Sequence, residues 1–300
     1  MILTYQSLDG LLDTLRSILV QDYKDLEIVI SDDATDGISE KDIHARITPL
    51  AEKYPHKICI RRNLKNLGIV AHANLAATCC MGEYIKFLSP GDSFCSDQAV
   101  SQMIAAARHT GCQIITSPSL AYVADTRSIC YEFPSRRRIR ILQRGTPEQL
   151  FIRMAANNII SAVGTVYHKS FFEEGGFDDS YRNLDDWPTW LRYFNSGKQM
   201  GVQPIPTVYY ALDGISNGSG TAFESPMLRK DMIHCYEKEI IPFEKRFPFW
   251  VRWMVGFRYG QLIGTHSLYY RLIYSPLTAF CWIKKKGKQI VVAHCSKRFL

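Results

Sequence analysis

The stretch LEIVI at residues 26–30 runs directly into SDDATDG at residues 31–37. A second stretch has the same form, because YIKFL at residues 84–88 runs into SPGD at residues 89–92. Short apolar runs that end in Asp, Gly, Ser or Pro predict buried β-strands followed by turns. Both stretches therefore place acidic side chains just beyond the end of a predicted strand.

Helical and strand periods alternate on both sides of these two stretches. In chain order we expect strand 2–5, helix 8–19, strand 26–30, helix 38–54, strand 58–60, helix 68–80, strand 84–88 and helix 99–107. This alternation predicts an α/β fold, with a mostly parallel, Rossmann-like central sheet flanked by helices. Ligands of such sheets bind beyond the carboxyl ends of the strands, which here are segments 32–37, 63–68 and 89–93.

After residue 111 the pattern becomes less regular. The expected elements are a long strand at 113–123, a basic loop or edge strand at 135–144, a strand at 161–168, a helix at 187–194 and a strand at 202–210. Residues 213–221 read DGISNGSGT, which predicts a mobile loop. We expect one domain at 1–222 and a helical, basic and aromatic C-terminal extension at 223–300.

Charge and cysteine content narrow the classes of protein that fit. The chain has 36 Lys/Arg and 29 Asp/Glu, a net charge of +7, while residues 228–300 hold 14 Lys/Arg against 4 Asp/Glu. This uneven charge suggests that the extension contacts an anionic partner. The 9 cysteines show no metal-site spacing, which indicates free thiols in a reducing compartment. Neither a signal peptide nor an apolar run long enough to span a bilayer is expected.

Three acidic clusters carry the candidate chemistry, and each has an ordinary structural explanation. Asp32 and Asp33 suit turns and helix caps, or they accept hydrogen bonds from a base and a ribose. Asp92 follows a Pro-Gly turn, which it either closes or uses to bind Mg²⁺ or Mn²⁺ together with substrate phosphates. Asp185 and Asp186 favour a helix start, or they serve as a general base.

The order and surroundings of these clusters resemble family 2 glycosyltransferases. The resemblance is carried by ILTYQS, LLDTLRSILVQDY and LEIVISDDATDG within residues 2–37, by NLGIVAHANLAATCCMGEYIKFLSPGD at 66–92, by GGFDDSY at 175–181 and by NLDDWPTWLRYF at 183–194. It implies the GT-A fold, with a nucleotide-sugar half at about 1–110 and an acceptor half at about 111–222. It also implies inversion at the anomeric carbon of the transferred sugar.

The resemblance assigns donor-binding roles to positions in the first half of the chain. The positions that match those holding the nucleotide base and ribose are Thr4, Tyr5, Asp32 and Asp33. Asn66 and Gly68 match the Asn-x-Gly segment that the family holds near the donor. A nucleotide sugar is therefore the expected ligand of this half.

The resemblance further implies a catalytic base and a metal. Asp186, with Asp185 beside it, matches the position of the base that removes a proton from the acceptor hydroxyl. Asp92 falls in the Asp-x-Asp region, where the family holds a divalent cation, Mn²⁺ or Mg²⁺, and the diphosphate. This sequence departs from the family there, because the two Asp-x-Asp positions are Ser89 and Gly91.

Basic residues suggest two further contacts. Arg136, Arg137, Arg138, Arg140 and Arg144 form either a solvated face or a contact with a phosphate-bearing, lipid-linked acceptor. Between residues 249 and 258 Trp and Phe interleave with Arg, which suits peripheral contact with a membrane. A helical flap or a dimer contact would use the same residues. A nucleic-acid partner is not expected, because no recognised module is present.

Together these features predict an enzyme that transfers a sugar from a nucleotide-sugar donor, UDP-linked in the first instance, to a hydroxyl of a glycan or lipid-linked acceptor. The resemblance places it in surface polysaccharide biosynthesis, in the cytoplasm and on the inner face of the cell membrane. Two alternatives stay open. The missing Asp-x-Asp carboxylates fit a scaffold with a decayed active site. Nucleotidyl transfer is disfavoured, because residues 6–13 hold one Gly and neither Lys nor Arg.

Overall fold

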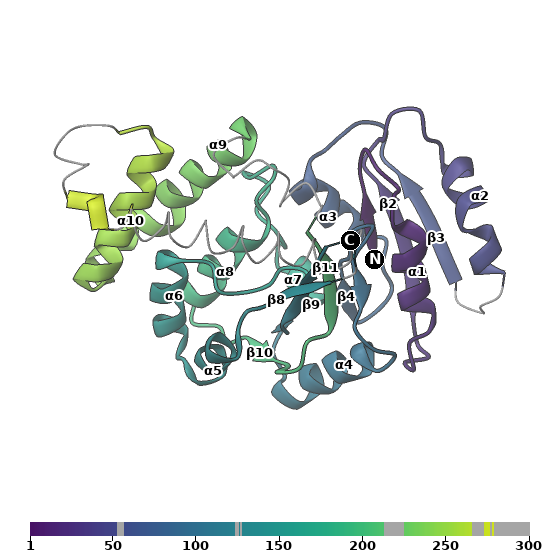
Figure 1. Ribbon diagram of the computed structural model, residues 1–300, viewed down its shortest axis with the longest axis horizontal. Helices are drawn as coiled ribbons and strands as arrows, with labels where there is room; N and C mark the ends of the chain where they lie inside the picture. The colour runs from purple at the N-terminus through teal and green to yellow at the C-terminus, as the bar shows by residue number, and fades with distance from the viewer. Residues whose placement is uncertain are drawn as a thin grey trace.

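The computed structural model describes residues 1–52, 57–123, 126, 128–212, 225–265, 273–276 and 278 (Figure 1). In chain order its elements are β1 (Ile2–Thr4), α1 (Leu11–Leu19), β2 (Glu27–Asp32), α2 (Glu40–Ala51), β3 (Lys57–Arg62), α3 (Ile69–Ala77), β4 (Tyr84–Lys86), β5 (Ser93–Phe94), α4 (Ala99–Thr110), β6 (Ile114–Thr116), β7 (Ser119–Tyr122), β8 (Ile129–Phe133), α5 (Arg136–Arg144), α6 (Pro147–Ala156), β9 (Thr165–His168), α7 (Ser170–Glu173), α8 (Asp186–Asn195), β10 (Gly201–Val202), β11 (Val208–Ala211), α9 (Pro226–Cys235), the π-helical turn η1 (Tyr236–Ile240), the 3-10 helix η2 (Ile241–Arg246) and α10 (Phe249–Leu262). The predicted alternation of strands and helices in the first 110 residues is confirmed.

The central sheet joins two sets of strands. β1, β2 and β3 are parallel, and β4, β9, β6 and β10 form the second set. The two sets meet beside Leu88, whose N–H donates to the carbonyl of Met1 and whose carbonyl accepts from Leu3, both at 3.0 Å. The strand order is therefore β3-β2-β1-β4-β9-β6-β10, and β9 alone among these strands runs antiparallel to its neighbours. The predicted, mostly parallel α/β sheet is confirmed.

Successive side chains of the strands point into two different cores. Ile2, Ile115 and Val166 pack with α1, α2 and α4, whereas the adjacent Leu3, Ile114 and Tyr167 pack with α3, α6 and α8. This alternation follows from strand geometry, in which neighbouring side chains face opposite sides of the sheet. Helices therefore cover both faces, and the carboxyl ends of the parallel strands β1, β2 and β4 lie at one edge.

A smaller sheet corrects two predictions. The strand expected at 113–123 divides into β6 and β7 at Ser117 and Pro118, and the strand expected at 202–210 divides into β10 and β11. Pro118 has no backbone N–H and cannot donate a hydrogen bond to a neighbouring strand. The N–H of Ser117 donates to the carbonyl of Gly164 at 2.8 Å. β7 and β11 then pair with each other and with β8 and β5 in the second sheet.

The basic segment at 135–144 is a helix, so the expected loop or edge strand was wrong. Ile139 and Leu142 of α5 are buried, at a spacing of three residues that brings both onto one face of a helix. Arg136, Arg137, Arg140 and Arg144 are exposed around the rest of α5. Arg and Ile alternate at residues 138–141, which would also fit a strand, but burial follows the helical period.

The C-terminal extension packs against the main body. Cys235, Tyr236, Ile240, Phe247 and Val251 are buried in the same core as α6 and α8. Figure 1 shows α9 and α10 together at one end of the molecule, with α2 at the other end. No helix in the described ranges is long and apolar enough to cross a membrane. The loop expected at 213–221 and the boundary expected at 222 lie outside the described residues.

Candidate active site

Asp32 closes the end of β2 from inside the protein. Its side chain is fully buried, and its oxygens accept hydrogen bonds from the hydroxyl of Thr4 at 2.8 Å and from the hydroxyl of Thr35 at 2.6 Å. The backbone N–H of Thr35 donates to it at 2.9 Å, and Nε of Arg62 lies 3.5 Å away. Asp32 and Thr4 thus fix the turn that follows β2, and these hydrogen bonds of Asp32 all join it to protein groups.

Asp33 holds the loop that follows β3. Its two oxygens accept hydrogen bonds from the side chain of Asn63 at 2.8 Å and from the N–H groups of Leu67 and Gly68 at 3.0 Å. The side chain is 2% exposed. Tyr5 stands at the same edge but is 39% exposed, so its ring is accessible to a ligand. Both predicted donor-binding residues lie at the carboxyl ends of neighbouring parallel strands.

Arg182 lies against the segment Asn66–Gly68 from the opposite side. Its guanidinium donates to the carbonyl of Leu67 at 3.2 Å and to the side-chain oxygen of Asn66. Gly68 has φ +84°, and a Cβ there would lie 2.6 Å from Cγ of Arg182. Only glycine therefore allows this close approach. Arg182 was not among the predicted site residues, although it directly follows the segment GGFDDSY at 175–181.

The SPGD turn is built tightly against α1. The hydroxyl of Thr14 accepts from the N–H of Gly91 at 3.0 Å, and Tyr122 donates to the carbonyl of Gly91 at 2.6 Å. Asp92 accepts from the N–H of Ser89 at 3.0 Å and, more weakly, from the N–H of Ala211 at 3.4 Å. Asp92 therefore closes the turn with its own side chain.

This geometry does not fit a metal-holding role for Asp92. The carboxylate is 4% exposed, and burial raises its pKa to about 6, although hydrogen bonds and the charge of Lys86 oppose the rise. Ser89 and Gly91 bring no second carboxylate. Within the described ranges no group of three or more His, Cys, Asp or Glu side chains could hold a metal ion.

Asp185 and Asp186 stand at the start of α8. One oxygen of Asp186 accepts from the side chain of Asn158 at 3.0 Å, and the other accepts from the N–H of Trp187 at 2.6 Å. Both residues are half-buried, in contrast to the buried Asp32, Asp33 and Asp92. Asn158 belongs to the loop before β9, whose antiparallel direction brings that loop to the carboxyl end of β4.

The environment of this pair favours proton transfer near neutral pH. Burial, followed by the negative charge of Asp186, raises the pKa of Asp185 to about 7. Burial also raises the pKa of Asp186, while the bonds from Trp187 and Asn158 oppose the rise. Two adjacent carboxyl groups resist holding two negative charges, so Asp185 keeps its proton up to about pH 7. A carboxylate of this kind is a competent general base.

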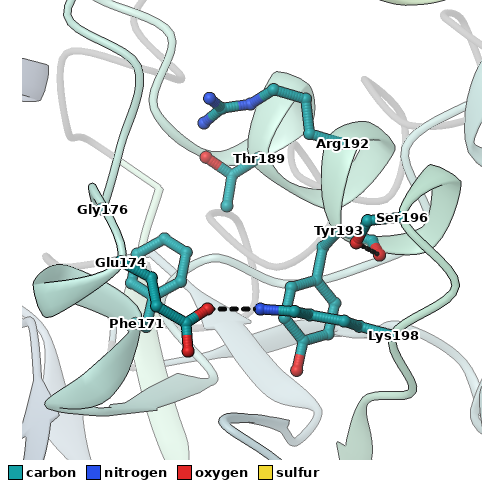
Figure 2. Close-up of a pocket in the computed structure, with 8 residues that line it drawn as sticks. All are labelled: Phe171, Glu174, Gly176, Thr189, Arg192, Tyr193, Ser196 and Lys198. Atoms are coloured by element: carbon teal, nitrogen blue, oxygen red, sulfur yellow. Dashed lines mark hydrogen bonds and ion pairs between the residues drawn. The ribbon is translucent and has the colours of Figure 1, made fainter.

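A surface hollow lies elsewhere, next to α8. It has a volume of about 120 Å³ and is lined by Phe171, Glu174, Gly176, Thr189, Arg192, Tyr193, Ser196 and Lys198 (Figure 2). Lys198 and Glu174 form an ion pair at 2.5 Å across it. The hollow borders the second half of α8, whereas Asp185 and Asp186 stand at its first turn. It contains none of the predicted site residues.

The described geometry joins most of the predicted residues in two groups. Asp33, Gly68, Asn66 and Arg182 form one connected set, and Asp185 follows Arg182 in the same loop. Asp32 with Thr4 forms the other, directly beside Asp33. No hydrogen bond in the described part of the chain joins Asp92 to either group.

Comparison with known proteins shows the family to which the chain belongs. The sequence model of glycosyl transferase family 2 matches residues 1–176. The chain belongs to this family of glycosyltransferases. It is 33% identical over 105 residues to an uncharacterized glycosyltransferase of Rickettsia conorii and, equally, to one of Rickettsia felis. Each match covers 33% of this chain, and the chain spans only 15% of the length of those two relatives.

Solved structures share the fold. S. aureus TarS 1-349 in complex with UDP-GlcNAc is 12% identical, with a TM-score of 0.55 over 97% of this chain and 89% of that one. A mannosyltransferase of Pyrobaculum calidifontis, in complex with GDP-Man and Mn²⁺, is 15% identical, with a TM-score of 0.57 over 97% and 84% of the two chains. At this identity the likeness defines the fold, which is the predicted GT-A fold with a helical C-terminal region.

Proposed function

We propose that this protein transfers a sugar from a nucleotide-sugar donor to a hydroxyl group, with inversion and with Asp186 as the general base. The observation that carries the proposal is the pair Asp185 and Asp186, half-buried at the first turn of α8 with raised pKa values. Asn158 and the N–H of Trp187 orient Asp186. The acceptor hydroxyl is a very weak acid, so a carboxylate that takes its proton lowers the barrier.

The donor would lie over the edge formed by β1 and β2. Tyr5 offers an exposed ring for the base, while Thr4, Asp32 and Asp33 set the shape of the floor. Asn66 and Gly68 border the same edge through their contacts with Asp33 and Arg182. Related folds bind UDP, UDP-GlcNAc and GDP-Man, and we propose a UDP-linked donor here.

A divalent cation would supply charge neutralisation for the leaving diphosphate. A solved relative holds Mn²⁺, but Asp92 is turned inward and Ser89 and Gly91 replace the usual carboxylates. The proposal therefore assigns no step to a metal held by Asp92. A metal requirement stays a prediction that the experiment below tests.

The acceptor is proposed to be a glycan or a lipid-linked sugar, used in surface polysaccharide biosynthesis on the cytoplasmic side of a membrane. Exposed arginines on α5 and exposed aromatic side chains at the start of α10 support this setting. Phe249 is 75% exposed and Trp250 is 46% exposed, with Arg252 beside them. Aromatic and basic side chains together suit an anionic lipid surface.

The first experiment is thermal unfolding with a panel of nucleoside diphosphates and nucleotide sugars, each with and without Mn²⁺. A ligand at 100 times its Kd should stabilise the protein by about 2.7 kcal/mol. We expect one nucleotide to raise Tm, and Asp186→Asn to keep that shift while transfer falls roughly 10²–10⁴-fold. An equal shift without Mn²⁺ would remove the metal from donor binding.

A scaffold with a decayed site is the second candidate, favoured by the loss of the Asp-x-Asp carboxylates at Ser89 and Gly91. It predicts that no nucleotide or nucleotide sugar changes Tm. It also predicts that Asp186→Asn leaves polysaccharide assembly in cells unchanged. Either result in a folded protein would overturn the enzyme proposal.

A further inference from the structure

A buried carboxylate of the C-terminal extension reaches the loop in front of the candidate base. Asp231 of α9 is 5% exposed, and its Oδ2 accepts the backbone N–H groups of Arg182 at 3.0 Å and Asn183 at 2.5 Å. Within the described residues it forms no ion pair. Moving a charged carboxylate out of water costs free energy, and in the described part of the chain Asp231 is bonded only to backbone amides. Its role therefore lies in fixing the positions of those two amides.

The position of Arg182 matters because its side chain holds the loop Asn66–Gly68, called the candidate donor loop below. The guanidinium donates to Leu67 and to Asn66, and the carbonyl of Arg182 accepts from the N–H of Val70 at 3.3 Å. On the opposite side the same loop is held by Asp33, through the N–H groups of Leu67 and Gly68. The loop is thus held between Asp33 at the end of β2 and Arg182, whose backbone Asp231 fixes.

The same loop leads directly to the candidate base. Asp185 and Asp186 follow Arg182 by three and four residues, in a segment that Asp231 holds at its start. A movement of Arg182 would therefore displace the donor loop and the base together.

The extension also touches the base by a second route. Arg258 of α10 donates to the side-chain oxygen of Asn157 at 3.0 Å, and the adjacent Asn158 donates to Asp186 at 3.0 Å. Two elements of the extension, α9 and α10, therefore reach the residues around Asp186 independently.

We propose that Asp231 is a positioning residue, which fixes Arg182 so that the Asn66–Gly68 loop and Asp186 keep one relative geometry. This inference rests on the proposed function for its catalytic consequence. Its structural consequence is that the candidate donor loop is held in one conformation, and this does not depend on any substrate.

The test compares Asp231→Ala, Asp231→Asn and Arg182→Ala in the full chain. Asp231→Ala leaves two N–H groups without an acceptor, whereas Asp231→Asn keeps an oxygen in the same place. Arg182→Ala removes only an exposed side chain, so it folds even if Asp231→Ala does not. The matched control is Glu148→Ala, which breaks another contact between extension and body, the Arg246–Glu148 ion pair.

Hydrogen exchange is the first readout, because it needs no substrate. We expect the amides of Leu67 and Gly68 to exchange about tenfold faster in Asp231→Ala and Arg182→Ala, and at the wild-type rate in Glu148→Ala. Asp231→Asn should lie between wild type and Asp231→Ala. Unchanged exchange at both amides in Arg182→Ala and Asp231→Asn would overturn the inference.

Donor kinetics are the second readout. Asp231→Ala and Arg182→Ala should each raise KM for the nucleotide sugar about tenfold, and the double variant should add little, because both act through one contact. If Asp231→Ala lowers Tm but leaves KM unchanged, the residue is only structural. If the wild type binds no nucleotide sugar while the exchange result holds, the proposed function fails and the positioning of the loop stands.

Discussion

Asp185 and Asp186 occupy adjacent positions, yet they differ in what holds them. Asp186 accepts bonds from Asn158 and Trp187, which favour its charged form. Burial, and then the like charge of Asp186, raise the pKa of Asp185 to about 7. The pair therefore releases its second proton near neutral pH, and Asp186 is the member prepared to act as a base.

The pH dependence of transfer follows from this pair. Because Asp186 must be ionised to act as the base and burial raises its pKa, kcat/KM should rise with pH along a limb above the ordinary range of an aspartate. Asp185 holds its proton up to about pH 7, so Asp185→Asn exchanges one neutral group for another and should leave this limb in place, whereas Asp186→Asn should abolish it. The measurement is kcat/KM across the acidic and neutral range for the three proteins. Loss of the limb in Asp185→Asn, or its survival in Asp186→Asn, would contradict Asp186 as the base.

Stability should change with pH in the opposite sense. The folded protein holds the proton of Asp185 up to about pH 7, whereas the unfolded chain releases it near 3.8. Between these values the folded state binds more protons, so the free energy of unfolding falls as pH rises. Asp185→Asn should flatten this decline in urea unfolding at pH 4, 5.5 and 7. An identical slope in both proteins would contradict the raised pKa.

At the scale of elements, α5 and the start of α10 present charge and aromatic surface. α5 turns Ile139 and Leu142 inward and leaves Arg136, Arg137 and Arg140 exposed. In the described residues these three exposed arginines form no ion pair. An anionic surface would relieve the mutual repulsion of these charges.

Binding to vesicles of phosphatidylglycerol and phosphatidylcholine tests this surface. Each basic contact is worth about 1 kcal/mol near an anionic bilayer, so Arg137→Ala and Arg140→Ala should each lower partitioning about fivefold. Binding should weaken with added salt. The control is Arg46→Ala on α2, at the far end of the molecule in Figure 1. Equal losses in all three variants would point to net charge rather than to a docking face.

At the scale of the whole molecule, the extension and the main body share one core. Phe247 is 3% exposed, and its ring lies 5.6 Å from that of Phe151 on α6. Two residues further on, Phe249 is 75% exposed. The described part of the extension thus contributes side chains to the core behind the candidate base, so its removal should unfold that half of the protein.

Two phenylalanines give a matched test. Phe247→Ala should lower the free energy of unfolding by about 3–5 kcal/mol, because it removes a buried ring and leaves a cavity. Phe249→Ala should change it by no more than about 0.5 kcal/mol. Urea unfolding of both variants measures the difference. Similar values would mean that the extension does not contribute to the shared core.

Local pattern accounts for much of this fold. The strand and helix periods predicted the first 110 residues well, because the strands and helices there bury a regular face each. The acidic turns after β2 and before α8 were also visible in SDDATDG and NLDDWPTWLRYF. The interruptions of the irregular strands were not visible in the sequence. The breaks at Pro118 and between β10 and β11 depend on which neighbouring strand supplies the next hydrogen bond. The helix at α5 was missed because its alternating Arg and Ile also fit a strand.

Residue order along the chain was enough to define the family, the α/β class and the edge where the candidate site lies, since each of these depends on short-range periodicity and motif order. Contacts between distant segments were not accessible in this way. That Asp92 accepts from Ala211, that Arg182 holds Asn66, and that Asp231 holds Arg182 depend on packing of segments 49 to 119 residues apart. Such partners are selected by three-dimensional proximity, and no local period in the sequence records that proximity.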